Sequence, residues 1–145
     1  MVSLVMRIRI ILTSILIGLS SFSVSAEVAV IVSMENPLTT ITRAQLVNIF
    51  LGRSSTFPGG GRALPVDQLD ANEQRQDFYN ENVGWSAAQL KAHWSKIIFT
   101  GRGQPPKQLE NDDAVEEFIL SNPRGIGYIQ KGNASVNVKI VDIVP

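Results

Sequence analysis

The sequence predicts a single α/β domain with a mostly parallel β-sheet, and three observations support this class. Short apolar segments typical of strands alternate along the chain with segments of helical periodicity. The first apolar segment, residues 28–32, is continuous and rich in β-branched side chains, as in a strand covered on both faces. The length of the chain suits one domain with its own core.

Residues 1–26 have the pattern of a secretory signal peptide. Arg7 and Arg9 precede an apolar stretch at residues 10–19, and the small residues Val24, Ser25 and Ala26 follow. The apolar stretch is shorter than the roughly 20 residues of a membrane span. The start of translation is either Met1 or Met6. We therefore expect a soluble periplasmic protein whose mature domain covers residues 27–145.

Composition argues against several functions. Without Arg7 and Arg9 the chain has eleven basic and thirteen acidic side chains, a balance that does not indicate a nucleic-acid partner. The absence of cysteine excludes disulfides, thiolate metal sites, a cysteine nucleophile and a lipid-bearing cysteine. A single histidine, His93, without a Gly-x-Ser-x-Gly turn or metal-ligand spacing, argues against hydrolysis and metal binding. We expect no enzyme activity, no metal and no cofactor, and we interpret His93 as a partly buried structural residue.

Asn36 and Pro37 close the first strand, and capping signals predict the elements that follow it. Thr42 is expected to cap a helix that runs to Phe50, because Gln45 stands three residues later as in a capping box. The elements that follow are a loop at residues 52–62, beginning with a helix-ending Gly52, and a short strand at residues 63–66.

Three further helices and two strands complete the prediction. Asp70 and Glu73 have capping-box spacing, which predicts a helix that carries Phe78 and Tyr79 and ends near Gly84. Ser86 is expected to cap the next helix, whose apolar face is interpreted as core: Ala87, Leu90, Trp94, Ile97 and Ile98. A turn at residues 100–106 leads to a helix that begins at Asn111 or Asp112, before closing strands at residues 126–129 and 136–144.

Two groups of residues in these elements have alternative interpretations. The acidic residues of the last helix are favoured as a solvated face over paired catalytic carboxylates; they are Glu110, Asp112, Asp113, Glu116 and Glu117. The glycine-rich loops beside Arg62 and Arg102 are favoured as turns over anion-binding cradles. Because ligands of open α/β sheets bind beyond the carboxyl ends of strands, we place the candidate site at residues 66–74.

Five stretches within about residues 28–130 carry a resemblance to a known family. They are the first strand followed by NPL, then LVNIFLGRSSTFPGGGRALPVDQ, RQDFYNENVG, HWSKIIFTGRGQPP and NPRGIGYI. As a set they resemble the phosphate-binding proteins of ABC transporters, within the type 2 periplasmic-binding-protein superfamily. The resemblance implies a three-layer domain like one lobe of such a protein, in a short single-lobe form. In that family the matching stretch is the second lobe of a two-lobed clamp.

The resemblance also implies where a ligand would bind. In the family an arginine follows the short strand, and a Ser-Gly-Thr opens the next helix and holds phosphate. Alignment on Phe78 places Gln68 at the arginine position and Asn72, Glu73 and Gln74 at the Ser-Gly-Thr. Glu73 would repel a phosphate at about 4 Å by about 4 kcal/mol at an effective dielectric of about 20. Arg75 would compensate if it pointed into the pocket, so the candidate ligand-binding residues are Gln68, Asn72, Glu73, Gln74 and Arg75.

These observations leave two functional hypotheses. The first is a non-catalytic periplasmic solute-binding-like protein that binds phosphate or another small polar solute weakly, with an ABC transporter or another membrane or periplasmic protein as its partner. The second is a periplasmic protein-interaction or sensory accessory module that has lost ligand binding. A homodimer with two lobes face to face would rebuild a two-sided cleft.

Overall fold

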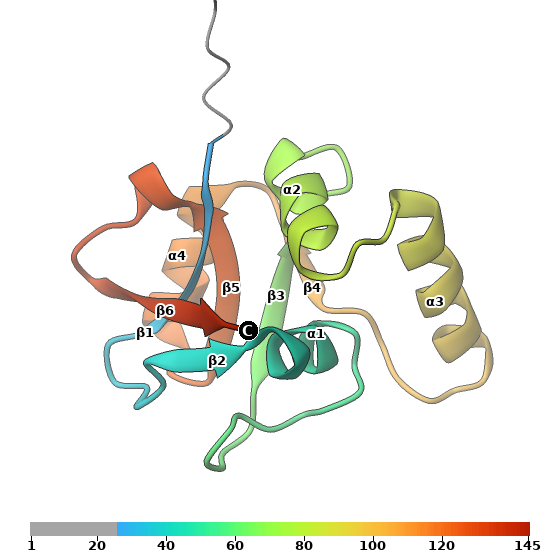
Figure 1. Cartoon of the computed structure of the whole chain (residues 1–145), viewed down its shortest axis with the longest axis horizontal. Helices are drawn as coiled ribbons and strands as arrows, with labels where there is room; N and C mark the ends of the chain where they lie inside the picture. The colour runs from blue at the N-terminus through green and yellow to red at the C-terminus, as the bar shows by residue number, and fades with distance from the viewer. Residues whose placement is uncertain (1–25) are drawn as a thin grey trace, which may run out of the picture.

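The structure is a computed structural model that describes residues 26–145. The predicted signal peptide, apart from Ala26, and both candidate start residues lie outside the described residues. The elements in chain order are β1 (Val28–Ser33), β2 (Thr40–Thr42), α1 (Arg43–Phe50), β3 (Leu64–Gln68), α2 (Glu73–Asn82), α3 (Ala87–Phe99), β4 (Lys107–Leu109), α4 (Asp112–Ser121), β5 (Gly125–Gln130), the 3₁₀ turn Lys131–Asn133 and β6 (Val138–Val144) (Figure 1).

The strands form one six-stranded sheet in the order β2-β6-β1-β5-β3-β4. β1 runs antiparallel to both of its neighbours, β5 and β6. The pairs β2–β6, β3–β5 and β3–β4 are parallel. Five strands therefore point the same way and β1 alone is reversed, which confirms the predicted mostly parallel sheet.

Helices cover both faces of this sheet, so the predicted three-layer α/β class is confirmed. On one face, Phe50 of α1 and Phe78 of α2 pack with Tyr128 of β5. Trp94 of α3 and Val30 of β1 belong to the same apolar cluster. On the other face, α4 packs Val115 and Ile119 against Ile31, Val66 and Ile129. Successive β1 residues thus enter different cores, as expected for a strand covered on both sides. In the described part of the chain, none of the helices has the length and hydrophobicity that a membrane crossing requires.

Two helices begin where local capping signals predict. The Thr42 hydroxyl accepts a hydrogen bond from Gln45 N while the Gln45 side chain accepts one from Thr42 N, which makes a complete capping box for α1. Ser86 and Gln89 make the same reciprocal pair at α3. Gly52 follows α1 with φ of +72°, a conformation that glycine adopts without a steric penalty.

The start of α2 was predicted wrongly. Asn72, rather than Asp70, occupies the N-cap position, and its side chain caps no helical amide. The Asp70 carboxylate instead accepts a hydrogen bond from Gln108 Nε2 at 2.7 Å and lies 3.4 Å from Arg75 Nη1. A tertiary contact with β4 thus replaces the local cap.

Three other predictions need correction. The three-residue strands β2 and β4 were not predicted; pairing with a neighbouring strand defines each of them. The strand expected at residues 63–66 extends to Gln68 as β3. In α3, Leu90 and Trp94 are buried but Ile98 is 48% exposed, so only part of the apolar face belongs to the core.

We predict that Gly127→Ala destabilises the fold because α4 lies very close to β5. A Cβ atom at Gly127 would lie 2.8 Å from Val115 Cγ1 and 3.0 Å from Val66 Cγ2. Overpacking of this kind typically lowers the free energy of unfolding by about 1–3 kcal/mol. Urea denaturation measures the change. Gly132→Ala, whose Cβ would meet nothing within 4 Å, is the control, and equal effects of the two variants would contradict the packing of α4.

Candidate functional site

A polar pocket lies where β3 ends and helices α2 and α4 begin. We call it the α2–α4 pocket; its volume is about 290 Å³. It is lined by Gln68, Asn72, Gln74, Glu110, Asn111, Asp112, Asp113 and Asn133. All eight are Asn, Gln, Asp or Glu. The pocket lies at the carboxyl ends of parallel strands, the edge at which open α/β sheets bind ligands.

Gln68 forms the floor of this pocket and is 1% exposed. Its Nε2 donates to Asp112 Oδ1 at 2.8 Å and to the Tyr128 carbonyl at 3.0 Å. Its Oε1 accepts from Asn72 Nδ2 at 3.0 Å, and the same Asn72 nitrogen donates to the Glu110 carbonyl at 2.9 Å. Both amide hydrogens of Gln68 are therefore engaged within the protein.

Asp112 is the second anchor of the pocket and corrects the expected solvated face, since it is only 8% exposed. In addition to the Gln68 amide, its carboxylate accepts hydrogen bonds from Gln130 N at 3.0 Å and Asn133 Nδ2 at 2.8 Å. These bonds connect the start of α4 to the ends of β3 and β5. They also compensate the cost of burying the carboxylate.

The structure separates the five predicted site residues. Gln68, Asn72 and Gln74 line the α2–α4 pocket, whereas Glu73 and Arg75 do not. Arg75 is 9% exposed and lies on the other side of α2, where its guanidinium contacts Asp67, Asp70 and the ring of Tyr79. The compensating role considered for Arg75 therefore has no support in the geometry.

Arg75 belongs to a buried group that we call the Asp67 cluster: Asp67, Arg75, Tyr79 and Tyr128. Asp67, which is 2% exposed, accepts hydrogen bonds from both tyrosine hydroxyls; the Tyr79 bond is 2.7 Å long. Gln68 N also donates to it at 2.8 Å. Arg75 Nε lies 3.4 Å away, an ion-pair contact that is longer than a hydrogen bond. The pKa of Tyr79 and that of Tyr128 are raised well above the usual value, mainly because both side chains are buried. The charge of Asp67 and its hydrogen bonds to the two hydroxyls raise them further.

The electrostatics of the α2–α4 pocket disfavour anions. Glu110, Asp112 and Asp113 line it, and no Lys or Arg does. The first turns of α2 and α4 face the pocket and favour negative charge, but both turns already contain acidic residues. Among residues 26–145, no group of three His, Asp or Glu side chains is placed to hold a metal ion. The pocket can instead accept hydrogen bonds from hydroxyl or ammonium groups.

His93 has the structural role that was predicted for it. It is partly buried on α3, and its Nε2 lies 2.9 Å from the Leu51 carbonyl. Its ring lies close to those of Trp85 and Trp94, with centroid distances of 5.3 and 5.0 Å.

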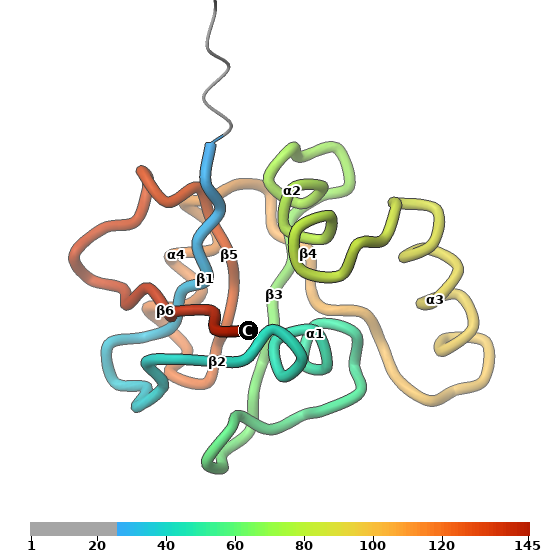
Figure 2. Tube along the Cα trace, viewed as in Figure 1, coloured from blue at the N-terminus to red at the C-terminus, as the bar shows by residue number. Residues whose placement is uncertain are grey.

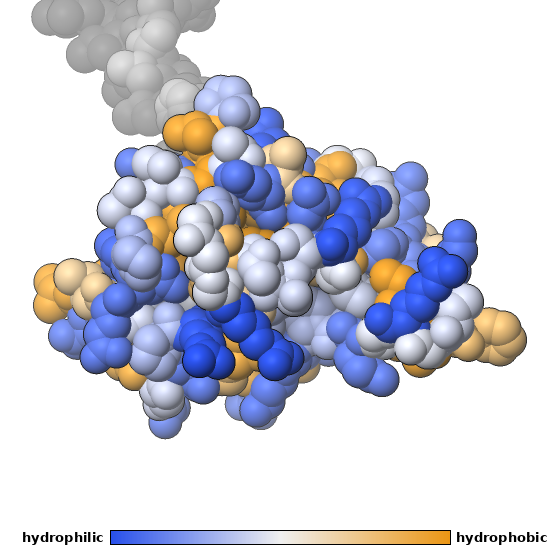
Figure 3. Space-filling view, turned by 90° about the horizontal axis from the view of Figure 1, so that it is seen from below, coloured by the Kyte–Doolittle hydropathy of each residue, from blue (hydrophilic) through white to orange (hydrophobic). Residues whose placement is uncertain are grey.

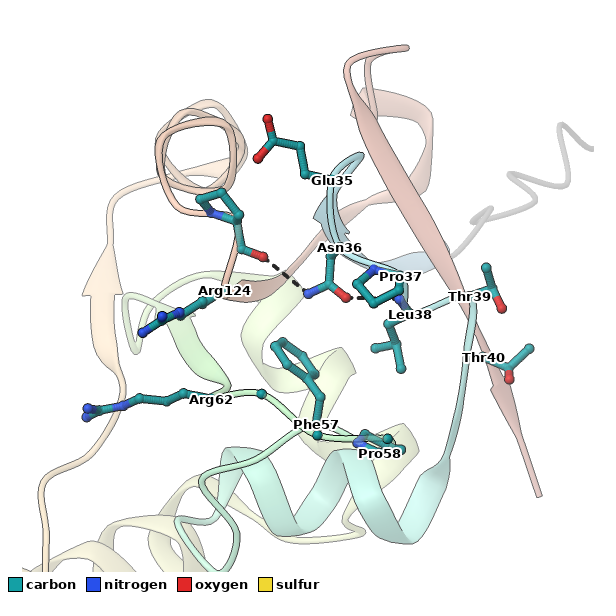
Figure 4. Close-up of a pocket in the computed structure, with 14 residues that line it drawn as sticks. Glu35, Asn36, Pro37, Leu38, Thr39, Thr40, Phe57, Pro58, Arg62 and Arg124 are labelled. Atoms are coloured by element: carbon teal, nitrogen blue, oxygen red, sulfur yellow. Dashed lines mark hydrogen bonds between the residues drawn. The ribbon is translucent and has the colours of Figure 1, made fainter.

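A larger hollow of about 590 Å³ lies at the opposite edge of the sheet, where β3 and β5 begin (Figure 4). The three-glycine loop forms one of its walls. Phe57 N donates to the Gly61 carbonyl and Gly60 N to the Phe57 carbonyl, and all three glycines have positive φ, so the loop has the geometry of a tight turn. In Figure 4, Arg62 and Arg124 extend side by side and away from Leu38. The hydrogen bonds and the positive φ values support the turn interpretation. We take the α2–α4 pocket as the candidate site because three of the five predicted ligand-binding residues line it.

Sequence reasoning missed five of the residues that line the pocket: Glu110, Asn111, Asp112, Asp113 and Asn133. They come from the start of α4 and the turn after β5. One signal could have found part of this set. A strand ends at Leu109 and a helix begins at Asp112, as β3 ends at Gln68 and α2 begins at Glu73. Junctions of this kind meet at the same edge of a parallel sheet.

The three-layer fold is similar to one part of several solved proteins of phosphate transport. Solved structures with this fold include a proposed phosphate ABC transporter substrate-binding protein with bound phosphate from Clostridium perfringens, at 22% identity and a TM-score of 0.63, over 80% of this chain and 44% of the other. An ABC-type phosphate transport receptor from Vibrio cholerae is 17% identical, with a TM-score of 0.57, over 79% of this chain and 44% of the other. PstS from Borrelia burgdorferi is 17% identical, with a TM-score of 0.59, over 80% of this chain and 46% of the other.

These likenesses establish the fold. The chain spans less than half of the length of each of these three structures. No protein-family model and no curated protein matches the chain.

We predict that the two tyrosines stay protonated at alkaline pH for as long as the protein is folded. Tyr79 and Tyr128 are the only tyrosines in the sequence, so tyrosinate absorbance reports on the Asp67 cluster alone. Because burial raises both pKa values, the neutral phenols stabilise the fold fully below pH about 10, the pKa of tyrosine in the unfolded chain. Above it, the free energy of unfolding falls by up to about 1.4 kcal/mol per pH unit for each tyrosine.

The measurement is an absorbance titration with circular dichroism recorded in parallel. Tyrosinate should form together with unfolding, and in urea it should form near pH about 10. Ionisation near that pH with unchanged circular dichroism would show that the tyrosines are not held by Asp67.

Proposed function

We propose that this protein is a non-catalytic periplasmic binding protein that takes a small polar solute in the α2–α4 pocket. The observation that supports the proposal most is the position of the pocket at the carboxyl ends of β3 and β4, in a fold shared with binding proteins. Of the predicted ligand-binding residues, Gln68, Asn72 and Gln74 line it.

The lining chemistry indicates the class of solute. Amide and carboxylate oxygens accept hydrogen bonds, and the three carboxylates attract positive charge. A phosphate would meet these carboxylates without a lysine or arginine among the lining residues, and the Gln68 amide is already bonded internally. The solute is therefore an uncharged polyol or a small amine, in contrast to the phosphate bound in the Clostridium perfringens structure.

The open shape of a single lobe implies weak binding, because well-formed sites bury most of the ligand surface. A covering partner would strengthen it. Delivery to an ABC transporter and a face-to-face homodimer stay predictions; sedimentation with and without solute tests the dimer.

A second candidate function is a protein-interaction or sensory accessory module without a solute. One observation favours it: Gln68, Asn72 and Asp112 satisfy one another, so the pocket is ordered without a ligand.

Thermal unfolding against phosphate, sulfate, polyols and amines tests both functions. A solute at 100 times its Kd should raise the free energy of unfolding by about 2.7 kcal/mol, which is several degrees in Tm. We predict that a polyol or an amine produces this shift and that phosphate does not. Gln74→Ala should reduce the shift, whereas Gln76→Ala, on the same helix but outside the pocket, should not.

A saturable phosphate shift would overturn the proposed solute class. No shift with any compound would favour the accessory module.

A further inference from the structure

The charges of this protein are strongly segregated along the chain. Residues 82–109 contain four cations, Lys91, Lys96, Arg102 and Lys107, and no Asp or Glu. The rest of residues 26–145 carries seven basic and thirteen acidic side chains. All four cations are exposed, and none forms an ion pair within residues 26–145. The segment is therefore a basic surface on an otherwise acidic protein.

This basic segment is also the part of the molecule that projects from the sheet. α3 stands at one side of the body, and the chain returns from its far end through an extended loop to β4 (Figure 2). Phe99, at the end of α3, is 92% exposed and Ile98 is 48% exposed. On the same side of the molecule as α3, hydrophobic surface projects next to hydrophilic surface (Figure 3).

A groove of about 360 Å³ lies between α3 and the segment that leads into β4, and we call it the α3 groove. Most of its lining is apolar: Ala87, Ala88, Leu90, Trp94, Ile98 and Pro105. Lys91 and Arg75 also line it. Its one acidic residue, Asp70, is already paired with Arg75 and bonded to Gln108. The groove shares no lining residue with the α2–α4 pocket.

We infer that the α3 groove binds an acidic amphipathic helix of a partner protein. An apolar groove beside a cationic surface matches a helix with apolar side chains on one face and carboxylates beside them. A concave groove favours this occupant over a lipid surface, because the side chains of a helix can enter a hollow that a flat layer of headgroups would leave unfilled. The inference is independent of the solute proposal, since the two sites are separate.

A titration with a defined peptide tests the inference. The probe is a synthetic helix of Leu and Glu in an amphipathic pattern, and the same peptide with Lys in place of Glu is its control. Trp94 lines the groove, so tryptophan fluorescence of the full protein reports binding. We expect saturable binding of the acidic peptide only. Raising the salt from about 0.1 M to about 1 M should weaken it, as the screening length falls from about 10 Å to about 3 Å.

Matched variants locate the contact. Lys91→Glu should weaken the acidic peptide at least about tenfold, because it places a like charge in the interface. Ile98→Ser should weaken it without changing the salt dependence. Arg62→Glu makes the same charge change where β3 begins, outside the groove. It should alter the affinity less than about twofold, because an exposed charge distant from the groove is largely screened.

Three outcomes would overturn the inference. These are equal binding of the two peptides, equal effects of Lys91→Glu and Arg62→Glu, and no binding of the acidic peptide. Binding to anionic vesicles without binding to the peptide would indicate a membrane surface instead. Self-association that Lys91→Glu abolishes would indicate a second copy of the chain as the occupant.

Discussion

The buried carboxylate of Asp67 is the constraint on which the candidate site depends. It lies at the end of β3 and accepts hydrogen bonds from Tyr79 of α2 and Tyr128 of β5, while Arg75 lies beside it. A carboxylate buried to this extent is tolerated only when such partners satisfy it. The same contacts fix the position of α2 against the sheet, and the Tyr128 ring stacks on Phe78 with a centroid distance of 4.1 Å. The Asp67 cluster therefore couples the aromatic core to the end of β3, from which Gln68 enters the pocket.

Asp112 has a complementary role at the start of α4. Its bonds to Gln68, Gln130 N and Asn133 hold together three segments that are far apart in sequence. Two carboxylates thus order this edge of the sheet through contacts inside the protein. Because Arg75 is engaged with Asp67 and the Gln68 amide with Asp112, neither is available for an anion. The fold is shared with a structure that holds phosphate, whereas the pocket in this chain is lined by three acidic residues and by no lysine or arginine.

Local signals predicted those parts of the fold that local contacts determine. The Thr42–Gln45 capping box and the Ser86 cap formed as expected because each involves only four consecutive residues. Asp70–Glu73 has the same spacing, but Gln108 of β4 binds Asp70 from 38 residues away, a tertiary contact that spacing does not reveal. Asp112 was interpreted as solvated for the same reason. It lies on an otherwise acidic helix face, and its partners are 18 to 44 residues away in the sequence. Three of the residues predicted for ligand binding line the pocket, and the direction of Arg75 could only be known once Asp67 was seen beside it.

The central claim is that internal contacts to Asp67 order the corner between β3 and α2. The most direct measurement compares the free energies of unfolding of Asp67→Asn and Asp70→Asn by urea denaturation. Both substitutions remove a carboxylate that contacts Arg75, but Asp67 is buried and the Asp70 side chain is 81% exposed. Asp67→Asn should cost about 3 kcal/mol or more, as for a broken buried pair, and Asp70→Asn less than about 1 kcal/mol. Equal, small losses for the two variants would contradict the claim.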